Sequence, residues 1–210
     1  MRLALPAGPL LRGARELLAR AGVEAETDPR DPFSIPQRVA DGEFAAGLCG
    51  LDHVHEADLE PIAALLDLGL DPTDLVVASL NTAPGPETVA SEYPRISRRW
   101  AEVNRLPNLR VLPREATDAA RADLFLGRVP PGRGPEGGTV RERILRATTW
   151  LIARRDAVRT EGPDGPLHAL VGRLKQAGIR REILGTQHPS ALADPAREGW
   201  DRWGRSEEGW

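Results

Sequence analysis

Residues 2–22 have the sequence Arg-Leu-Ala-Leu-Pro-Ala-Gly-Pro-Leu-Leu-Arg-Gly-Ala-Arg-Glu-Leu-Leu-Ala-Arg-Ala-Gly, and this stretch predicts the fold class. It opens with a short, mostly apolar run that stops at Pro6 and Gly8, a pattern typical of a buried strand ending in a turn. From residue 10 to 21, apolar side chains recur at helical spacing, and Gly22 supplies a helix stop. Strand, glycine turn and helix are the opening unit of an α/β protein, in which the helix N-terminus can face an anion.

The chain continues this alternation to about residue 178, which predicts mixed or parallel sheets with helices on both faces. We expect further helices over residues 36–41, 59–66, 93–103, 116–122 and 167–177. We expect further strands over residues 45–51, 75–80, 89–91, 109–112, 123–129 and 148–153, with residues 140–145 either helix or strand. The Pro-rich residues 26–34 and the Gly- and Pro-dense residues 130–138 are expected to be loops.

The composition argues against several classes of protein. The chain carries 28 Lys and Arg against 31 Asp and Glu, a net charge of -3, which is unlike a general nucleic-acid binder. We see neither an apolar stretch long enough to cross a membrane nor a signal-peptide pattern, so we expect a cytoplasmic protein without a membrane partner. The single cysteine, Cys49, excludes an internal disulfide, and its apolar, Gly-flanked surroundings predict a buried core residue.

Several stretches, taken in order along the chain, carry specific patterns. They are LPAGPL at residues 5–10, IPQRV at 35–39, AGLCGLDHV at 46–54, LLDLGL at 65–70, VASEYP at 89–94 and WLIAR at 150–154. These stretches resemble the catalytic chain of ATP phosphoribosyltransferase, the first enzyme of histidine biosynthesis, in its short form. The family's counterpart of residues 89–94 is V-A-T-K-Y-P, and this match is the most specific of the set.

The resemblance implies a two-lobed fold like that of a type II periplasmic binding protein, with a cleft between the lobes. One lobe would comprise residues 1–79 plus 146–178, and the other residues 80–145. Residues 179–210 would form a polar tail. The implied reaction transfers phosphoribosyl from phosphoribosyl pyrophosphate to N1 of ATP, with Mg²⁺ assisting the departure of pyrophosphate. Short-form members work as oligomers with a regulatory subunit resembling histidyl-tRNA synthetase, so we expect a homo-oligomer and such a partner.

Site residues follow from the same resemblance. The expected ATP-binding residues are Leu5, Gly8 and Asp52. The expected phosphoribosyl pyrophosphate-binding residues, several of them in the glycine-rich loop after residue 129, are Asp123, Arg128, Gly132, Arg133, Gly134 and Thr139. Two anionic substrates call for backbone N–H groups in such a loop at a helix start, with Arg or Lys nearby. No residue is assigned a catalytic role.

The segment around Asp52 also contains His53, His55 and Asp58, which together suggest a metal cluster. The resemblance instead places a loop entering a helix there, with the two aspartates as caps and the histidines solvated. We therefore predict no metal site in this segment.

The chain departs from the family pattern at its phosphate loop. Gly127 replaces an acidic residue, Pro131 replaces a Ser or Thr, and extra residues separate Gly132 from Thr139. The first-turn Lys and Arg of the family are Ala7 and Pro9 here. Three hypotheses stay open. The first is an active ATP phosphoribosyltransferase, and the second is a catalytically impaired relative that binds a nucleotide or phosphosugar or serves as a regulatory subunit. The third is a small-anion binding protein that uses the same two-lobed cleft, although the missing signal peptide counts against the usual periplasmic role.

Overall fold

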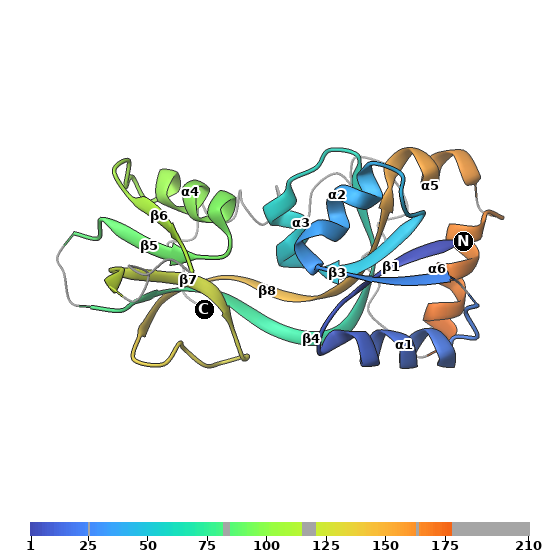
Figure 1. Ribbon diagram of the computed structural model, residues 1–210, viewed down its shortest axis with the longest axis horizontal. Coiled ribbons are helices and arrows are strands. Elements are labelled where there is room, and N and C mark those ends of the chain that lie inside the picture. The colour runs from blue at the N-terminus through green and yellow to red at the C-terminus, as the bar shows by residue number, and fades with distance from the viewer. Residues whose placement is uncertain (25, 82–84, 115–120, 163, 178–210) are drawn as a thin grey trace. The chain divides into compact units, whose positions relative to one another are not determined.

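The computed structural model describes residues 1–24, 26–81, 85–114, 121–162 and 164–177 (Figure 1). Its strands form one eight-stranded sheet in the order β2-β1-β3-β8-β4-β7-β5-β6. The strands are β1 (Arg2–Pro6), β2 (Glu26–Arg30), β3 (Ala46–Gly50), β4 (Ile62–Ser79), β5 (Thr88–Ser91), β6 (Arg110–Pro113), β7 (Leu124–Val129) and β8 (Thr139–Arg154). The helices are α1 (Leu10–Arg20), α2 (Ile35–Ala40), α3 (Leu51–Ala57), α4 (Pro94–Val103), α5 (Arg155–Glu161) and α6 (Pro166–Gln176), with the 3-10 helix η1 (Pro32–Ser34). This arrangement confirms the predicted α/β class.

The chain divides into two compact units. Among the described residues, unit 1 comprises residues 1–71 and 148–177, and unit 2 comprises residues 72–147. The chain passes from one unit to the other at residues 71/72 and 147/148, inside the long strands β4 and β8. The sequence placed these two boundaries at residues 79/80 and 145/146. Because β4 runs from Ile62 to Ser79 as one strand, no loop marks the first crossing. Two residues with left-handed backbone, Gly69 (φ 64°) and Asp71 (φ 47°), lie beside it.

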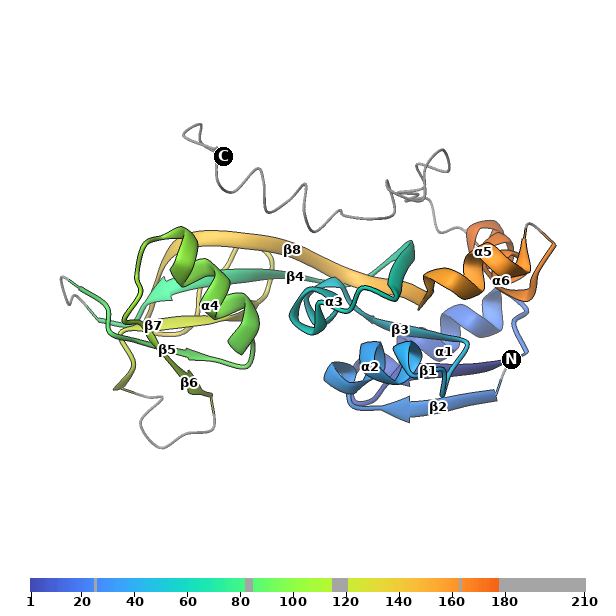
Figure 2. The ribbon, with the colours of Figure 1, turned by 90° about the horizontal axis from the view of Figure 1, so that it is seen from above.

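In unit 1, β1 pairs in parallel with both β2 and β3, and β3 pairs antiparallel with β8. Figures 1 and 2 show α1 and α2 on opposite faces of these strands. Buried side chains from α1, α6 and the strands form the core of one face: Leu3, Leu5, Ala14, Leu17, Leu48, Leu151, Leu170 and Leu174 among them. On the other face a Cβ at Gly47 would lie 2.6 Å from Ile35 Cγ2, so the glycine allows α2 to approach β3 closely.

Unit 2 has its own parallel strands, in which β5 pairs with β6 and with β7. The second half of β4 pairs antiparallel with β7, with Asp74 opposite Val129 and Ser79 opposite Leu124. In Figure 1, α4 lies along β5 and β6. The predicted apolar face was Ile96, Trp100 and Val103. Ile96 and Trp100 are buried, together with the ring of Tyr93, whereas Val103 at the end of the helix is 46% exposed.

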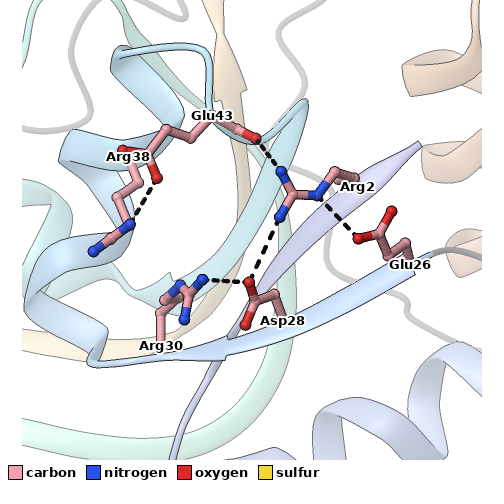
Figure 3. Close-up of polar contacts among 6 residues, drawn as sticks. All are labelled: Arg2, Glu26, Asp28, Arg30, Arg38 and Glu43. Atoms are coloured by element: carbon pink, nitrogen blue, oxygen red, sulfur yellow. Dashed lines mark hydrogen bonds and ion pairs between the residues drawn. The ribbon is translucent and has the colours of Figure 1, made fainter.

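The polar segment 26–34 is not a loop, as the sequence suggested, but contains β2 and η1. β2 is an edge strand, and its charged side chains are paired rather than buried (Figure 3). Arg2 on β1 contacts Glu26 at 3.2 Å and Asp28 at 3.6 Å, and Arg30 pairs with Asp28. β2 therefore forms without the alternation of apolar and polar residues that is typical of a half-buried strand, because salt bridges and pairing with β1 hold it in place.

The helix predicted over residues 59–66 is also wrong, since β4 begins at Ile62. Residues 62–66 are a continuous apolar run, which suits a buried helix and a strand covered on both faces equally well. Residues 140–145 are strand, and α5 was not anticipated. The predicted helix 116–122 and the tail 179–210 lie largely or wholly outside the described residues. In the described part of the chain, no helix has the length and apolar character needed to span a membrane.

Candidate functional site

Three segments meet at one edge of unit 1. Because β1, β2 and β3 are parallel, the turns that follow Pro6, Arg30 and Gly50 lie at the same carboxyl edge of the sheet. The backbone N–H of Ala7 donates to the carbonyl of Arg30 at 2.7 Å, which ties the first turn to the second. Ligands of open α/β sheets bind at this kind of edge. The turn at Gly8, the helix η1 and the start of α3 therefore form the candidate site in unit 1.

Gly8 lies in the turn that leads into α1, with left-handed backbone at φ 81°. Its carbonyl accepts the N–H of Leu11 at 3.1 Å, and Leu5 before it is fully buried. An open hollow of about 600 Å³ adjoins the turn and is lined by Gly8, Pro9, Leu11, Arg12, Arg15 and Glu16. Arg12 and Arg15 thus bring positive charge to the first turns of α1, although the family's cations at positions 7 and 9 are missing.

Asp52 and His53 lie in the first turn of α3 and are buried, with 0% and 3% of their surfaces exposed. His53 Nδ1 lies 3.4 Å from Asp52 Oδ1. A Cβ at Gly50 would overlap both side chains, so this close pair depends on a glycine at that position. The expectation that His53 is solvated is wrong, because the short helix turns its first residues toward the sheet.

Asp58 ends α3 as its C-cap with left-handed backbone at φ 48°. No group of three or more His, Cys, Asp or Glu side chains within the described ranges is placed to hold a metal ion.

Cys49 is fully buried, as predicted. Burial, and secondarily the charge of Asp52, raises the pKa of its thiol far above the ordinary value, so the thiolate is disfavoured.

Phe33 on η1 is a site residue that the sequence did not reveal. Its ring centroid lies 4.5 Å from that of His53, and the two ring planes are nearly perpendicular at 87°. Phe33 is nevertheless 37% exposed. The polar residues around it gave no periodic signal, and its pairing with a histidine 20 positions away follows only from the parallel strands.

In unit 2 the glycine-rich residues 130–138 form a structured loop after β7. Two turns close within it: Arg133 N–H donates to Pro130 O at 3.0 Å, and Gly138 N–H donates to Pro135 O at 3.1 Å. The loop leads into β8 at Thr139, so the expected helix start is absent. The reason is that residues 139–154 form a long strand between β3 and β4.

A carboxylate of the chain already occupies part of this loop. Asp74 is 2% exposed, and its Oδ2 accepts the N–H of Gly132 at 2.8 Å. The same oxygen lies 2.9 Å from Nε of Arg143. One glycine N–H and one arginine that could face a phosphate are therefore engaged by an internal anion.

The residues predicted for phosphoribosyl pyrophosphate binding are spread along the antiparallel pair of strands β4 and β7. Gly132 lies at the Asp74 end, with Arg128, whose Nε donates to Thr73 Oγ1 at 3.1 Å. The loop then returns to the other end of this strand pair, where a Cβ at Gly138, next to Thr139, would lie 3.2 Å from Ser79 O. Gly134 lies at the same end as Gly138, since its Cβ would lie 3.7 Å from Gly138 O. Gly132 and Arg128 lie at the Asp74 end, so the structure does not gather the predicted set into one cradle.

Asp123 precedes β7 and is engaged in structural hydrogen bonds. Its carboxylate accepts Asn81 Nδ2 at 2.8 Å, the N–H groups of Glu87 and Thr88 at 2.9 and 3.0 Å, and Thr88 Oγ1 at 2.9 Å. These bonds, led by the one from Asn81, lower the pKa of Asp123 to about 2. The geometry makes this residue a clamp between the ends of three strands, and its predicted contact with substrate stays a prediction.

The carboxyl edge of β5 in unit 2 also differs in charge from the family pattern. Glu92 stands where that pattern has a lysine, and it pairs with Arg114 Nη1 at 2.7 Å. A Cβ at Gly127 would overlap the ring of Phe125, so the residue that replaces the family's acidic side chain is packed against an aromatic ring.

A model of the ATP phosphoribosyltransferase family matches residues 31–113 of the chain. The chain is 29% identical to an ATP phosphoribosyltransferase of Gluconobacter oxydans over 210 residues, covering 83% of this chain and 86% of that protein. It is 30% identical to one of Gemmatimonas aurantiaca over 203 residues, covering 82% and 69% of the two chains. With one from Natronomonas pharaonis, 36% identity extends over 127 residues, 49% of this chain and 45% of that protein.

Solved structures agree on the fold. A chain of the ATP phosphoribosyl transferase (HisG:HisZ) complex from Thermotoga maritima superposes with a TM-score of 0.72 at 19% identity, covering 84% of this chain and 97% of that one. The alkanesulfonate-binding protein SsuA from Xanthomonas axonopodis pv. citri gives 0.53 at 12% identity, covering 84% and 72%. The periplasmic-binding-protein-like fold expected from the resemblance is thus confirmed. From its residues, its fold and these relatives, the chain belongs to the ATP phosphoribosyltransferase family.

Proposed function

We propose that this protein is an ATP phosphoribosyltransferase that catalyses the first step of histidine biosynthesis. The observation that carries the proposal is the carboxyl edge of unit 1, where the Gly8 turn and the start of α3 come together on parallel strands. These are the two segments that the family resemblance assigns to ATP. Leu5 supports the turn from the core and Asp52 supports α3, so both act from beneath the nucleotide.

The polyphosphate of ATP is assigned to the Gly8 turn. Helix α1 starts there, and the unpaired N–H groups and dipole of a helix start favour an anion. Arg12 and Arg15 line the adjoining hollow and add two positive charges. In this proposal, the two arginines take over the role of the family cations that are absent at positions 7 and 9.

The chemical step is a substitution at the anomeric carbon of phosphoribosyl pyrophosphate. The lone pair of adenine N1 forms the new N–C bond as the bond from that carbon to the pyrophosphate oxygen breaks, and pyrophosphate leaves. Mg²⁺ enters as part of the phosphoribosyl pyrophosphate substrate, bound to its phosphate oxygens. Arg133 and Arg128 are the proposed sources of positive charge for the leaving group, with Gly132, Gly134 and Thr139 of the same loop region.

We place the protein in the cytoplasm, as a homo-oligomer with a regulatory subunit resembling histidyl-tRNA synthetase. The support is the fold likeness to a chain from a HisG:HisZ complex. Size-exclusion chromatography of the chain, alone and mixed with such a subunit, tests the assembly. A monomer that never co-elutes with the subunit would contradict it.

A second candidate, a catalytically impaired relative, is favoured by the loop in unit 2. Asp74 holds Gly132 N–H, Pro131 offers neither hydroxyl nor N–H, and Glu92 reverses a positive charge. Such a protein would bind ATP or phosphoribosyl pyrophosphate without turning them over.

One assay separates the two candidates. The full chain is incubated with ATP, phosphoribosyl pyrophosphate and Mg²⁺, with and without the regulatory subunit, and both pyrophosphate and phosphoribosyl-ATP are measured. Formation of both products in equal amounts supports the enzyme. Binding of either ligand without product supports the impaired relative.

A double variant, Gly127→Asp with Pro131→Thr, restores the family's side chains in the loop. If the chain has lost activity by drift at these positions, the variant gains turnover. Because the new Cβ at position 127 overlaps the ring of Phe125, the variant is also made with Phe125→Leu to relieve that contact. The Phe125→Leu single variant is the matched control.

A further inference from the structure

An exposed aromatic ring lies at the carboxyl edge of unit 1. Phe33 is one of three phenylalanines in the chain, and it is 37% exposed. A single exposed apolar side chain is ordinary on a protein surface. The position of Phe33, after a parallel strand and beside two other turns of the candidate site, is what requires an explanation.

The ring is held in a fixed orientation. The turn η1 is closed by two hydrogen bonds to Asp31 O, from the N–H of Ser34 at 2.9 Å and from its Oγ at 2.8 Å. Edge-to-face contact with His53 at 4.5 Å supports the ring from the interior. His53 is itself 3% exposed and lies against the fully buried Asp52. A buried polar pair thus lies directly behind an exposed ring and limits the orientations that the ring can adopt.

The neighbouring turn has the complementary chemistry. Arg30, three residues before Phe33, accepts a hydrogen bond from Ala7, which adjoins Gly8. Three residues span at most about 10 Å, so the aromatic ring and the phosphate-binding turn lie within the reach of one nucleotide. An apolar ring near a helix start whose first turns carry Arg12 and Arg15 matches a ligand with a flat base at one end and phosphates at the other.

We infer that Phe33 stacks against the adenine base of ATP and thereby positions N1, with His53 and Asp52 fixing the ring from behind. The inference rests on the proposed function and adds to it the residue that recognises the base. Phe33 contacts the substrate, whereas His53 and Asp52 act through Phe33 and are positioning residues.

The test compares Phe33→Leu, which keeps an apolar side chain but removes the ring, with Phe33→Trp, which keeps a ring. Val103→Ala, at an exposed apolar position on α4, is the matched control. Each full-length variant is titrated by calorimetry with ATP, with inorganic tripolyphosphate, which lacks a base, and with phosphoribosyl pyrophosphate plus Mg²⁺. Circular dichroism and thermal melting establish that each variant is folded.

The expected result is that Phe33→Leu weakens ATP binding about tenfold, the size of one base–aromatic stack. Binding of tripolyphosphate and of phosphoribosyl pyrophosphate stays unchanged, and in turnover the KM for ATP alone rises. Phe33→Trp keeps the affinity, and ATP quenches its added indole fluorescence. The control binds all three ligands like the unmodified chain.

Unchanged ATP affinity in Phe33→Leu overturns the inference and leaves the proposed function intact. Equal weakening of all three ligands also overturns it, because the ring would then support the turn rather than the base. An unmodified chain that neither binds nor turns over ATP removes both the inference and the proposed function.

Discussion

Replacing Asp123 with alanine should destabilise the protein far more than it alters substrate affinity. Four donors converge on this carboxylate: Asn81 Nδ2, the N–H groups of Glu87 and Thr88, and Thr88 Oγ1. In return the N–H of Asp123 donates to Thr88 Oγ1 at 3.0 Å, and its carbonyl accepts the N–H of Leu80 at 2.9 Å. The side chain therefore joins the end of β4 to the starts of β5 and β7.

The size of the effect can be bounded in two ways. Hydrogen bonds to a charged group contribute about 1.5–3 kcal/mol each to the free energy of unfolding, but at a partly exposed position water can take the place of some of these bonds. The lowering of the Asp123 pKa from 3.8 to about 2 corresponds to somewhat over 2 kcal/mol at full value, and solvent screening reduces it to about 1–2 kcal/mol. We expect Asp123→Ala to lower the free energy of unfolding by about 2 kcal/mol, and Asp123→Asn by about half as much.

The pH dependence has a definite sign. Because folding lowers the pKa of this carboxyl group, its stabilisation is complete above the ordinary pKa of 3.8 and is lost as the pH falls toward about 2. The difference in stability between the unmodified chain and Asp123→Ala should therefore be constant from pH 7 to about 5 and shrink between about pH 4 and 2.

Urea unfolding followed by tryptophan fluorescence measures the change, and hydrogen exchange at Thr88 and Leu80 localises it. Asp156→Ala is the control: Arg154 lowers the pKa of Asp156 too, but that pair is exposed, so the unfolding midpoint should stay in place. A loss below about 0.5 kcal/mol in Asp123→Ala at pH 7 would refute the clamp. Normal stability with a raised KM for phosphoribosyl pyrophosphate would return Asp123 to the substrate site.

Three further outcomes are expected. Asp74→Ala should lower the free energy of unfolding by about 1–2 kcal/mol; the loss is modest because the partner Arg143 is half exposed and can be solvated by water. Hydrogen exchange measured by NMR should show faster exchange of the Gly132 amide, which Asp74 binds. Gly50→Ala should destabilise by about 2 kcal/mol in urea unfolding, since the new methyl group overlaps Asp52, whereas Gly172→Ala in α6, with open space around it, should stabilise by about 0.5–1 kcal/mol. Cys49 should resist a thiol reagent at pH 8 until urea unfolds the chain, since burial raises its pKa; rapid labelling of the native protein would contradict this.

The local sequence alone predicted the elements that have periodic apolar residues or that end at a Gly or Pro. The apolar spacing that buries Leu17 and Leu18 predicted α1, and Gly22 predicted its end. The small apolar residues of β3 and the turn-rich loop 130–138 were identified in the same way. The motifs at residues 5–10, 46–54 and 89–94 led to the family that the relatives confirm.

The tertiary structure decided what depends on a partner remote in sequence. β2 is a strand because β1 and Arg2 pair with it, and residues 62–66 are the buried first part of β4, which lies next to β8 in the sheet. The site changed for the same reason: parallel strands bring Phe33 to His53. A helix makes its backbone hydrogen bonds within one segment, so its sequence pattern is local. A strand, the hydrogen bonds of Asp123 and the contact of Phe33 with His53 all need partners that are remote in the sequence.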